Sequence, residues 1–320
     1  MLIKNIKLRY YDNLLDKLIQ SGDIQGIKEA LENIVRSDFS SYQNIILKYI
    51  YVLLEKDKFK EIFNQNLVWI NTFNKPDSDY LSKFIFYIIN KNQISCASPN
   101  SYAFYLNNLL KKIKKTNLSF QETVDFAYLY QFLITRHSNE IKIINSSGAF
   151  FETNQKRYFT HYNFTKAFFY VVRNPLSIFK ERKITNDDGD ISKNFFGLLS
   201  ADTNYIKTHS IDLNTIEENT QNWLVNVSSW AGPNVTSTFR GFVIRYEDLI
   251  SDPRQTFAEV VGHLVQSGLK INLNYQDIDD FIRDTPFEKK SFDDVEVSNK
   301  ELKLLRRDLG DISKKFGYEI

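Results

Sequence analysis

The chain has 320 residues, of which 42% are hydrophobic and 25% charged, and this composition is typical of a soluble globular protein with enough material for a sizeable core. The formal net charge of +2 excludes an overall field that would attract nucleic acid or an anionic membrane, so any anion site must be local. A single cysteine, Cys96, excludes an intrachain disulfide framework, and with only four histidines the chain gives little material for a structural zinc site.

The first part of the chain, residues 1–90, is predicted to be entirely helical. Apolar residues recur at helical spacing from Leu14 to Ile19 and again over 24–34, with a turn between them in which Asp23 is the predicted N-cap. Two further helices are expected over 41–54 and 58–66. Helix pairs of this kind resemble tetratricopeptide-type hairpin repeats, but the period is irregular. A helical extension packed on the main domain is the favoured interpretation.

The second part, residues 91–320, alternates between short apolar runs and amphipathic segments. Strands are predicted at 94–97, 141–144, 149–153, 167–172 and 240–245. Helices are predicted at 101–114, 121–135, 176–182, 215–230, 254–267, 277–283 and 299–316. This alternation predicts an α/β domain with a mainly parallel central sheet flanked by helices.

The segment 167–180, AFFYVVRNPLSIFK, is the most informative part of the sequence. Phe, Tyr and Val dominate the residues before Arg173, as in a strand buried on both faces, and Pro175 suits the first turn of a helix. Arg173 is therefore predicted at the carboxyl end of a parallel strand, where open α/β sheets bind their ligands. The planar fork of an arginine suits a phosphate group.

Three segments in this order resemble the sulfotransferases that use 3'-phosphoadenosine 5'-phosphosulfate (PAPS). The first is FFYVVRNPLSIF, similar to the family's strand that ends in R-N-P. The second is SSWAGPNVTSTFRGFVIRYEDLISDPRQTFAEVVGHL, and the third is DTPFE at 284–288, similar to the family's T-S-F-E. The resemblance implies a P-loop-like sulfotransferase domain over 91–320, with PAPS or adenosine 3',5'-bisphosphate (PAP) as its nucleotide and no metal.

The resemblance also implies roles for the residues that would hold the nucleotide. Arg173 would bind the 3'-phosphate, while Tyr246, Thr285 and Phe287 would surround the adenosine. The flat ring of a phenylalanine can stack on a purine. Glu181 stands where the family has a serine near the 3'-phosphate, which a carboxylate would repel. Ser177, one helical turn earlier, is the candidate substitute.

The residues that would handle the sulfuryl group depart from the family pattern. The family's phosphosulfate loop reads approximately P-K-S-G-T-T-W, and the best counterpart is PNSYAFYL at 99–106, where Asn100 replaces the lysine and Ser101 is a further donor. The general base is expected about twenty residues before R-N-P. Glu152 and His161 are the candidates, because a carboxylate or an imidazole can accept the proton of an acceptor hydroxyl. A lone histidine is more often structural.

The leading hypothesis is thus a transferase that moves a sulfuryl group from PAPS to a hydroxyl or amine of a small-molecule or glycan acceptor. One alternative is a domain that has lost catalysis and serves in binding or assembly, with a protein partner at the helical N-terminal region. Another is a transferase that uses a different phosphorylated donor. No apolar run reaches the roughly 18 residues of a membrane span, and no nucleic-acid partner is expected. We predict a cytoplasmic location.

Overall fold

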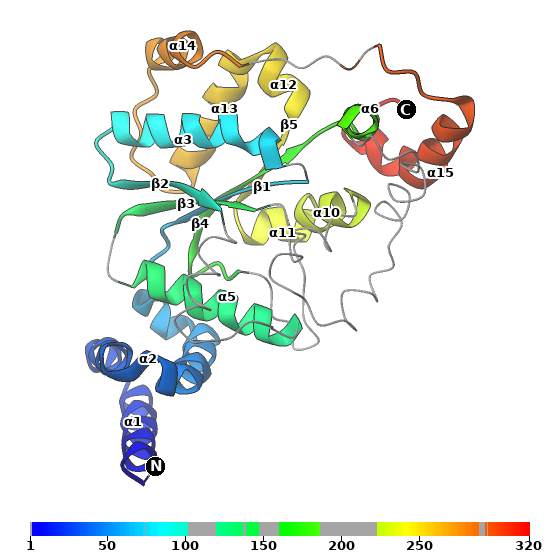
Figure 1. The fold of residues 1–320 in the computed structure, drawn as a ribbon. Helices are drawn as coiled ribbons and strands as arrows, with labels where there is room; N and C mark the ends of the chain where they lie inside the picture. Colours follow the sequence, from blue (N-terminus) through cyan, green and yellow to red (C-terminus); the bar gives the residue numbers. More distant parts are fainter. Residues whose placement is uncertain are drawn as a thin grey trace.

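A computed structural model describes residues 2–73, 75–101, 120–136, 139–146, 160–185, 223–287, 292 and 294–320. Its centre is a five-stranded sheet with the order β2-β3-β1-β4-β5 and parallel pairing throughout. The strands are β1 (Leu67–Thr72), β2 (Cys96–Ser101), β3 (Ile141–Ser146), β4 (Thr165–Val172) and β5 (Gly241–Arg245). Helices flank the sheet (Figure 1), which confirms the α/β fold class.

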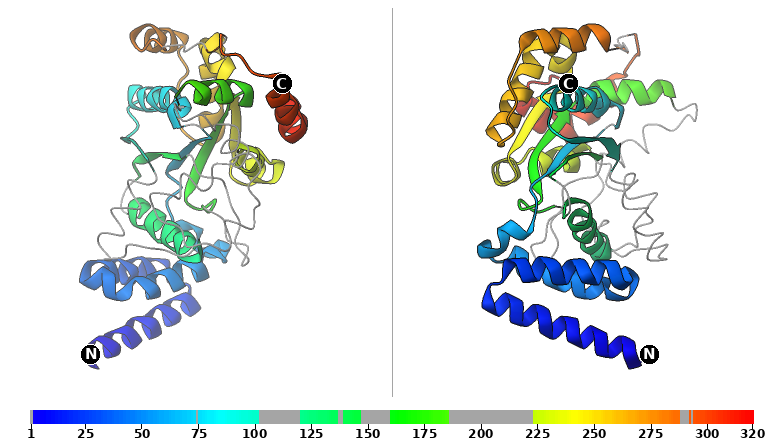
Figure 2. Two further views of the ribbon diagram at one scale, coloured as in Figure 1. Left: turned by 45° about the vertical axis from the view of Figure 1, so that its right-hand side comes forward. Right: turned by 90° about the vertical axis from the view of Figure 1, so that its left-hand side faces the viewer.

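Two long helices form the N-terminal end of the molecule. They are α1 (Leu2–Ser21) and α2 (Ile24–Leu54), and they pack side by side (Figure 2). Asp23 is the N-cap of α2, as predicted, since its carboxylate accepts a hydrogen bond from the Gly26 amide at 2.9 Å. The expectation of separate helices over 24–34 and 41–54 is wrong. The residues between them include no glycine or proline to interrupt a helix, and α2 runs through without a break.

The interpretation of residues 1–90 as entirely helical is also wrong. The expected helix at 58–66 is a short 3-10 helix, η1 (Asp57–Ile62), and β1 follows it. Every residue of β1 is buried, because the strand lies at the centre of the sheet between β3 and β4. A turn of 3-10 helix, η2 (Lys75–Ser78), and the helix α3 (Asp79–Lys91) come next. The central strand therefore comes from the part of the chain expected to be an extension.

The remaining described helices all come after β2 in the chain. They are α5 (Phe120–Thr135), α6 (Pro175–Thr185), α10 (Trp223–Trp230), α11 (Pro233–Thr238), α12 (Tyr246–Ser251), α13 (Pro253–Gln266), α14 (Tyr275–Asp284) and α15 (Asn299–Lys315). The strand expected at 94–97 is β2, two residues later than predicted. The strand expected at 149–153, the helix expected after Ser101 and the first part of the helix expected at 215–230 lie outside the described residues.

Each face of the sheet carries its own apolar cluster. On one face, Phe168 of β4 contacts Trp230 of α10, and the Tyr170 hydroxyl donates to Asn226 at 2.7 Å. On the other face, Phe84 of α3 stacks on Phe257 of α13 at 3.8 Å. None of the helices within the described ranges is both long and apolar enough to cross a membrane.

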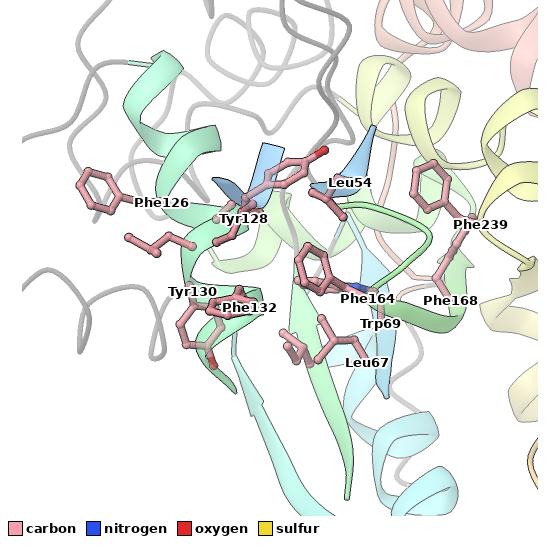
Figure 3. Packing of buried hydrophobic residues seen from close by; sticks show 14 of the residues in the cluster. Leu54, Leu67, Trp69, Phe126, Tyr128, Tyr130, Phe132, Phe164, Phe168 and Phe239 are labelled. Carbon is pink, nitrogen blue, oxygen red and sulfur yellow. The ribbon is translucent and has the colours of Figure 1, made fainter. Parts of the chain in front are cut away.

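The first of these clusters continues from the sheet into the N-terminal helices. Leu54 of α2 and Phe132 of α5 belong to the same buried cluster as Leu67 of β1 and Phe164, which precedes β4 (Figure 3). The helical region thus packs on the sheet through a shared core. The division of the chain into domains at 1–90 and 91–320 stays a prediction.

Candidate functional site

The topology of the sheet makes the carboxyl ends of β1 and β4 the candidate place for a ligand site. From β1 the chain crosses to β2 and β3 on one side, and β4 and β5 then form the other side. The strand order therefore reverses beside β1, and open parallel sheets bind their ligands at such a switch point. The turn η2 follows β1 here, and Arg173 follows β4 directly.

Arg173 is buried at this edge and held by two carboxylates. Its Nη1 atom lies 3.1 Å from Oδ1 of Asp77, in the turn after β1, and 2.6 Å from Oε2 of Glu181, on α6. The side chain of Arg173 is only 6% exposed. Its guanidinium also lies over the ring of Tyr246, with 4.7 Å between Cζ and the ring centroid. The arginine thus sits at the predicted place, but it is already engaged by acids of this chain.

Asp77 has an unusual electrostatic environment. Burial, together with the charges of Glu181 and Glu247, raises the pKa of its carboxyl to about 7, although the charge of Arg173 acts to lower it. A carboxyl with this pKa changes between its protonated and ionised forms near neutral pH. Among the described residues, no group of His, Cys, Asp and Glu side chains is arranged to hold a metal ion.

The turn after Arg173 is fixed by contacts from three distant segments. Oε1 of Glu247 accepts a hydrogen bond from the Asn174 amide at 3.0 Å, and Oε2 of Glu247 lies 2.7 Å from the hydroxyl of Tyr318. Nε1 of Trp223 donates to the carbonyl of Arg173 at 3.2 Å. Burial and the charge of Glu247 raise the pKa of Tyr318 above its ordinary value. The backbone of the R-N-P segment is therefore hydrogen-bonded to side chains of α10 and α12.

Aromatic rings lie beside the arginine. The ring of Phe287 contacts those of Tyr246 and Tyr80, with centroid distances of 5.8 and 5.0 Å. Burial raises the pKa of Tyr246 to about 12, so its hydroxyl stays protonated at neutral pH. Thr285, two residues before Phe287, ends α14 and is half-buried. The structure thus brings Arg173, Tyr246 and Phe287 together from three elements.

The first turns of α6 hold Ser177, the candidate partner of a 3'-phosphate, and Glu181, which stands where the family has a serine. Ser177 lies in the first turn and is half-buried. Glu181 lies one turn later, and its carboxylate makes the 2.6 Å ion pair with Arg173. The position where the resemblance implies a serine is therefore filled by an acid that contacts the arginine directly.

Asn100 and Ser101 do not lie in a loop after a strand, as expected, but inside the edge strand β2. Asn100 pairs with Ile144 of β3, and its amide donates to the carbonyl of Ser98 at 3.1 Å. Three strand spacings separate β2 from β4, or roughly 14 Å. This corrects the assignment of 99–106 as the phosphosulfate loop, since Pro99 to Ser101 are part of the sheet. Residues 102–106 lie outside the described residues.

His161 lies at the amino ends of the strands, whereas Arg173 lies at their carboxyl ends. It precedes the amino end of β4, and the eight residues of that strand span roughly 26 Å. Its Nδ1 atom accepts a hydrogen bond from the Asn163 amide, and burial lowers its pKa to about 4. The prediction of His161 as a general base at the same site as Arg173 is therefore wrong. The interpretation of His161 as a structural residue is favoured. Glu152 lies outside the described residues.

The turn after β1, which supplies Asp77, was not expected from the sequence. Residues 73–80 read FNKPDSDY, and Lys75 precedes Tyr80 by five positions. In the family's loop P-K-S-G-T-T-W the lysine precedes the tryptophan by the same five positions. The apolar run LVWINTF before this turn was the available signal, but it follows helical segments directly.

A cavity of about 670 Å³ lies elsewhere, where α2, η1 and α5 meet. Buried Leu31, Ile62 and Phe132 form its apolar floor, and the ion pair of Arg136 with Glu32, at 3.2 Å, lines its wall. None of the described residues predicted to bind the nucleotide or act in catalysis lines it.

The chain matches no model of a known protein family and no curated protein. The solved structures that resemble it include the mouse sulfotransferase SULT7A1 in complex with PAP. That similarity covers 84% of this chain and 94% of the other, with 13% sequence identity and a TM-score of 0.44. At this distance, the case for the site rests on the contacts around Arg173.

Proposed function

We propose that this protein is a nucleotide-dependent transferase of the sulfotransferase type. It binds an adenine nucleotide at the carboxyl ends of β1 and β4. It then transfers a sulfuryl group from the 5'-phosphosulfate of that nucleotide to a hydroxyl or amine of a small-molecule or glycan acceptor; the bond from sulfur to the bridging phosphate oxygen breaks, and the nucleotide leaves as its 5'-phosphate. The observation that carries this proposal is the buried guanidinium of Arg173 at the topological switch point, over the ring of Tyr246, which in turn contacts the ring of Phe287.

The aromatic residues suit the base of such a nucleotide. A purine stacked on a ring such as that of Phe287 gains ~1–3 kcal/mol of binding free energy. Tyr246 supplies a second ring and a protonated hydroxyl that can donate a hydrogen bond. Thr285 is the third residue that we propose for the adenosine side.

The donor that the resemblance implies, PAPS, fits this site only in part. The rings suit its adenine, whereas its 3'-phosphate does not suit an arginine that already contacts two carboxylates. We propose that the turn η2 lies beside the sulfuryl group. The sequence gives this turn one lysine, Lys75, and a positive charge stabilises the developing negative charge on sulfuryl oxygens.

We further propose Glu152 as the general base, since a carboxylate can accept the acceptor's proton. In this account Asn100 and Ser101 have no direct role, because β3 and β1 lie between their strand and β4. Ser177 stays a candidate for a polar contact with the ribose.

Nucleotide binding tests the proposal first. Isothermal titration with adenosine 5'-monophosphate (AMP) and with PAP should give saturable binding of at least one of them. Arg173→Ala should abolish it. The matched control is Arg254→Ala, which removes an exposed arginine on α13 and should leave binding unchanged. Absence of binding of both nucleotides at millimolar concentration contradicts the proposal.

A second candidate is a nucleotide-binding domain without transferase activity. The engagement of Arg173 by Asp77 and Glu181 favours it, because that arginine carries little free charge. Sulfate transfer to a panel of sugars, phenols and amines separates the two: binding without transfer to any acceptor identifies the binding domain. A protein partner at the N-terminal helices stays a prediction.

A further inference from the structure

Within the described residues, more carboxylates lie around Arg173 than suit a phosphate-binding site. Two carboxylate oxygens, from Asp77 and Glu181, lie within 3.1 Å of the same Nη1 atom. Glu247 is a third carboxylate, close enough to raise the pKa of Asp77. A phosphate that carries two negative charges would meet like charges in a poorly hydrated place, where their repulsion is only weakly screened.

The same arrangement suits a ribose hydroxyl. In dinucleotide-binding folds a carboxylate accepts a hydrogen bond from a ribose hydroxyl, whereas an arginine accommodates a phosphate at that position. Nε of Arg173 is buried and has no hydrogen-bond partner in the part of the chain that the structure describes. A hydroxyl can donate to a carboxylate and accept from a guanidinium N–H at once, while a phosphate dianion can only accept.

We propose that the nucleotide bound at this site carries a free ribose 3'-hydroxyl, and that Asp77 and Glu181 select against a 3'-phosphate. This rests on the proposed function, since it specifies the nucleotide of the same site. Glu181 is the more adaptable of the two acids, because its side chain is 21% exposed whereas that of Asp77 is 3% exposed. Glu181 is therefore the residue whose replacement should change the selection.

Two nucleotides that differ only in the 3'-phosphate test the proposal directly. Isothermal titration of the full chain at pH 7.5 should show AMP binding at least tenfold more tightly than PAP. In Glu181→Ser, which leaves one carboxylate on the arginine, the ratio should fall at least fivefold, mostly through tighter binding of PAP. Glu181→Gln keeps the volume of the side chain and should shift the ratio in the same direction if the serine variant folds poorly.

A matched control removes a charge elsewhere. Glu259→Gln changes an exposed acid on α13 and should leave the ratio unchanged. Tighter binding of PAP than of AMP by the wild-type protein would overturn the selection while leaving the proposed function intact. An unchanged ratio in both Glu181 variants would also overturn it. Failure of both nucleotides to bind would instead overturn the proposed function, and this inference with it.

Discussion

Asp77 and Arg173 are 96 positions apart in the sequence, yet Oδ1 of one lies 3.1 Å from Nη1 of the other. Their contact joins the turn after β1 to the end of β4 at the point where the strand order reverses. Both side chains are almost fully buried, and removing one partner of such a pair leaves an uncompensated charge inside the protein. The pair therefore links the stability of the fold to the state of the site.

The first prediction concerns pH. Burial raises the pKa of Asp77 from 3.8 to about 7. At a pH between these two values, the folded protein keeps a proton on Asp77, whereas the unfolded chain has released it. The stability contributed by this proton is present near pH 4 and is lost as the pH rises towards 7. Each unit of the shift corresponds to about 1.4 kcal/mol.

In Asp77→Asn this titration is absent, so the free energy of unfolding should depend less on pH. Urea unfolding at pH 5.5, 6.5 and 7.5 measures the slope for both proteins. Asp279→Asn, which removes a partly exposed acid on α14, should keep the wild-type slope. Equal slopes for wild type and Asp77→Asn would show that Asp77 titrates in its usual range.

The second prediction concerns the contact that fixes the R-N-P turn. Tyr318→Phe removes the hydroxyl that lies 2.7 Å from Oε2 of Glu247, at a side chain that is almost fully buried. Loss of a hydrogen bond to a charged group should lower the free energy of unfolding by about 1.5–3 kcal/mol. Tyr275→Phe is the control, because Tyr275 is largely exposed and its hydroxyl should contribute less than about 0.5 kcal/mol. Equal effects of the two substitutions would argue against the contact.

The third prediction tests the packing of β5 against β4. A Cβ atom at Gly241 would lie 2.1 Å from Cζ of Phe168, so Gly241→Ala should destabilise the protein by about 1–3 kcal/mol. At Gly262, inside α13, a Cβ atom would meet open space, and Gly262→Ala should stabilise by roughly 0.5–1 kcal/mol. Thermal unfolding compares the pair. Opposite signs are expected, and a neutral Gly241→Ala would contradict the pairing of these strands.

The fourth prediction concerns the turn after β1. If Lys75 stabilises charge on the sulfuryl group, Lys75→Ala should lower the rate of sulfate transfer about 100-fold or more while changing AMP affinity less than about tenfold. Lys83→Ala, at an exposed position of α3, is the control for loss of a nearby lysine. An unchanged transfer rate in Lys75→Ala would exclude the turn from the reaction.

Much of the sheet could be predicted from the sequence, because its strands have distinct boundaries. The run before Arg173 is apolar on both faces, and Pro175 marks the start of the next helix, so β4 and the place of the arginine were correct. The central strand β1 was missed for a physical reason. A short apolar run cannot be told from a buried helical segment by periodicity alone, and no glycine or proline separates β1 from η1.

The site itself was only partly predictable. Tyr246 lies against Arg173, and Phe287 contacts Tyr246, whereas the roles expected for both rings stay predictions. The pairing of Asp77 with Arg173 was beyond sequence reasoning, because it depends on two strands becoming neighbours. His161 is close to Arg173 in the sequence but far from it in the fold, because the whole of β4 lies between them.

Hydrogen exchange with AMP tests the central claim most directly, because it shows where on the chain the nucleotide binds. With millimolar AMP, the backbone amides of 75–80, 171–178 and 246–251 should exchange more slowly, since these segments surround Arg173 and the rings of Tyr246 and Tyr80. The segments 28–36 and 132–136, which line the separate cavity, should be unaffected. Protection confined to that cavity, or no protection at any of these segments, would contradict a nucleotide site at the carboxyl ends of β1 and β4.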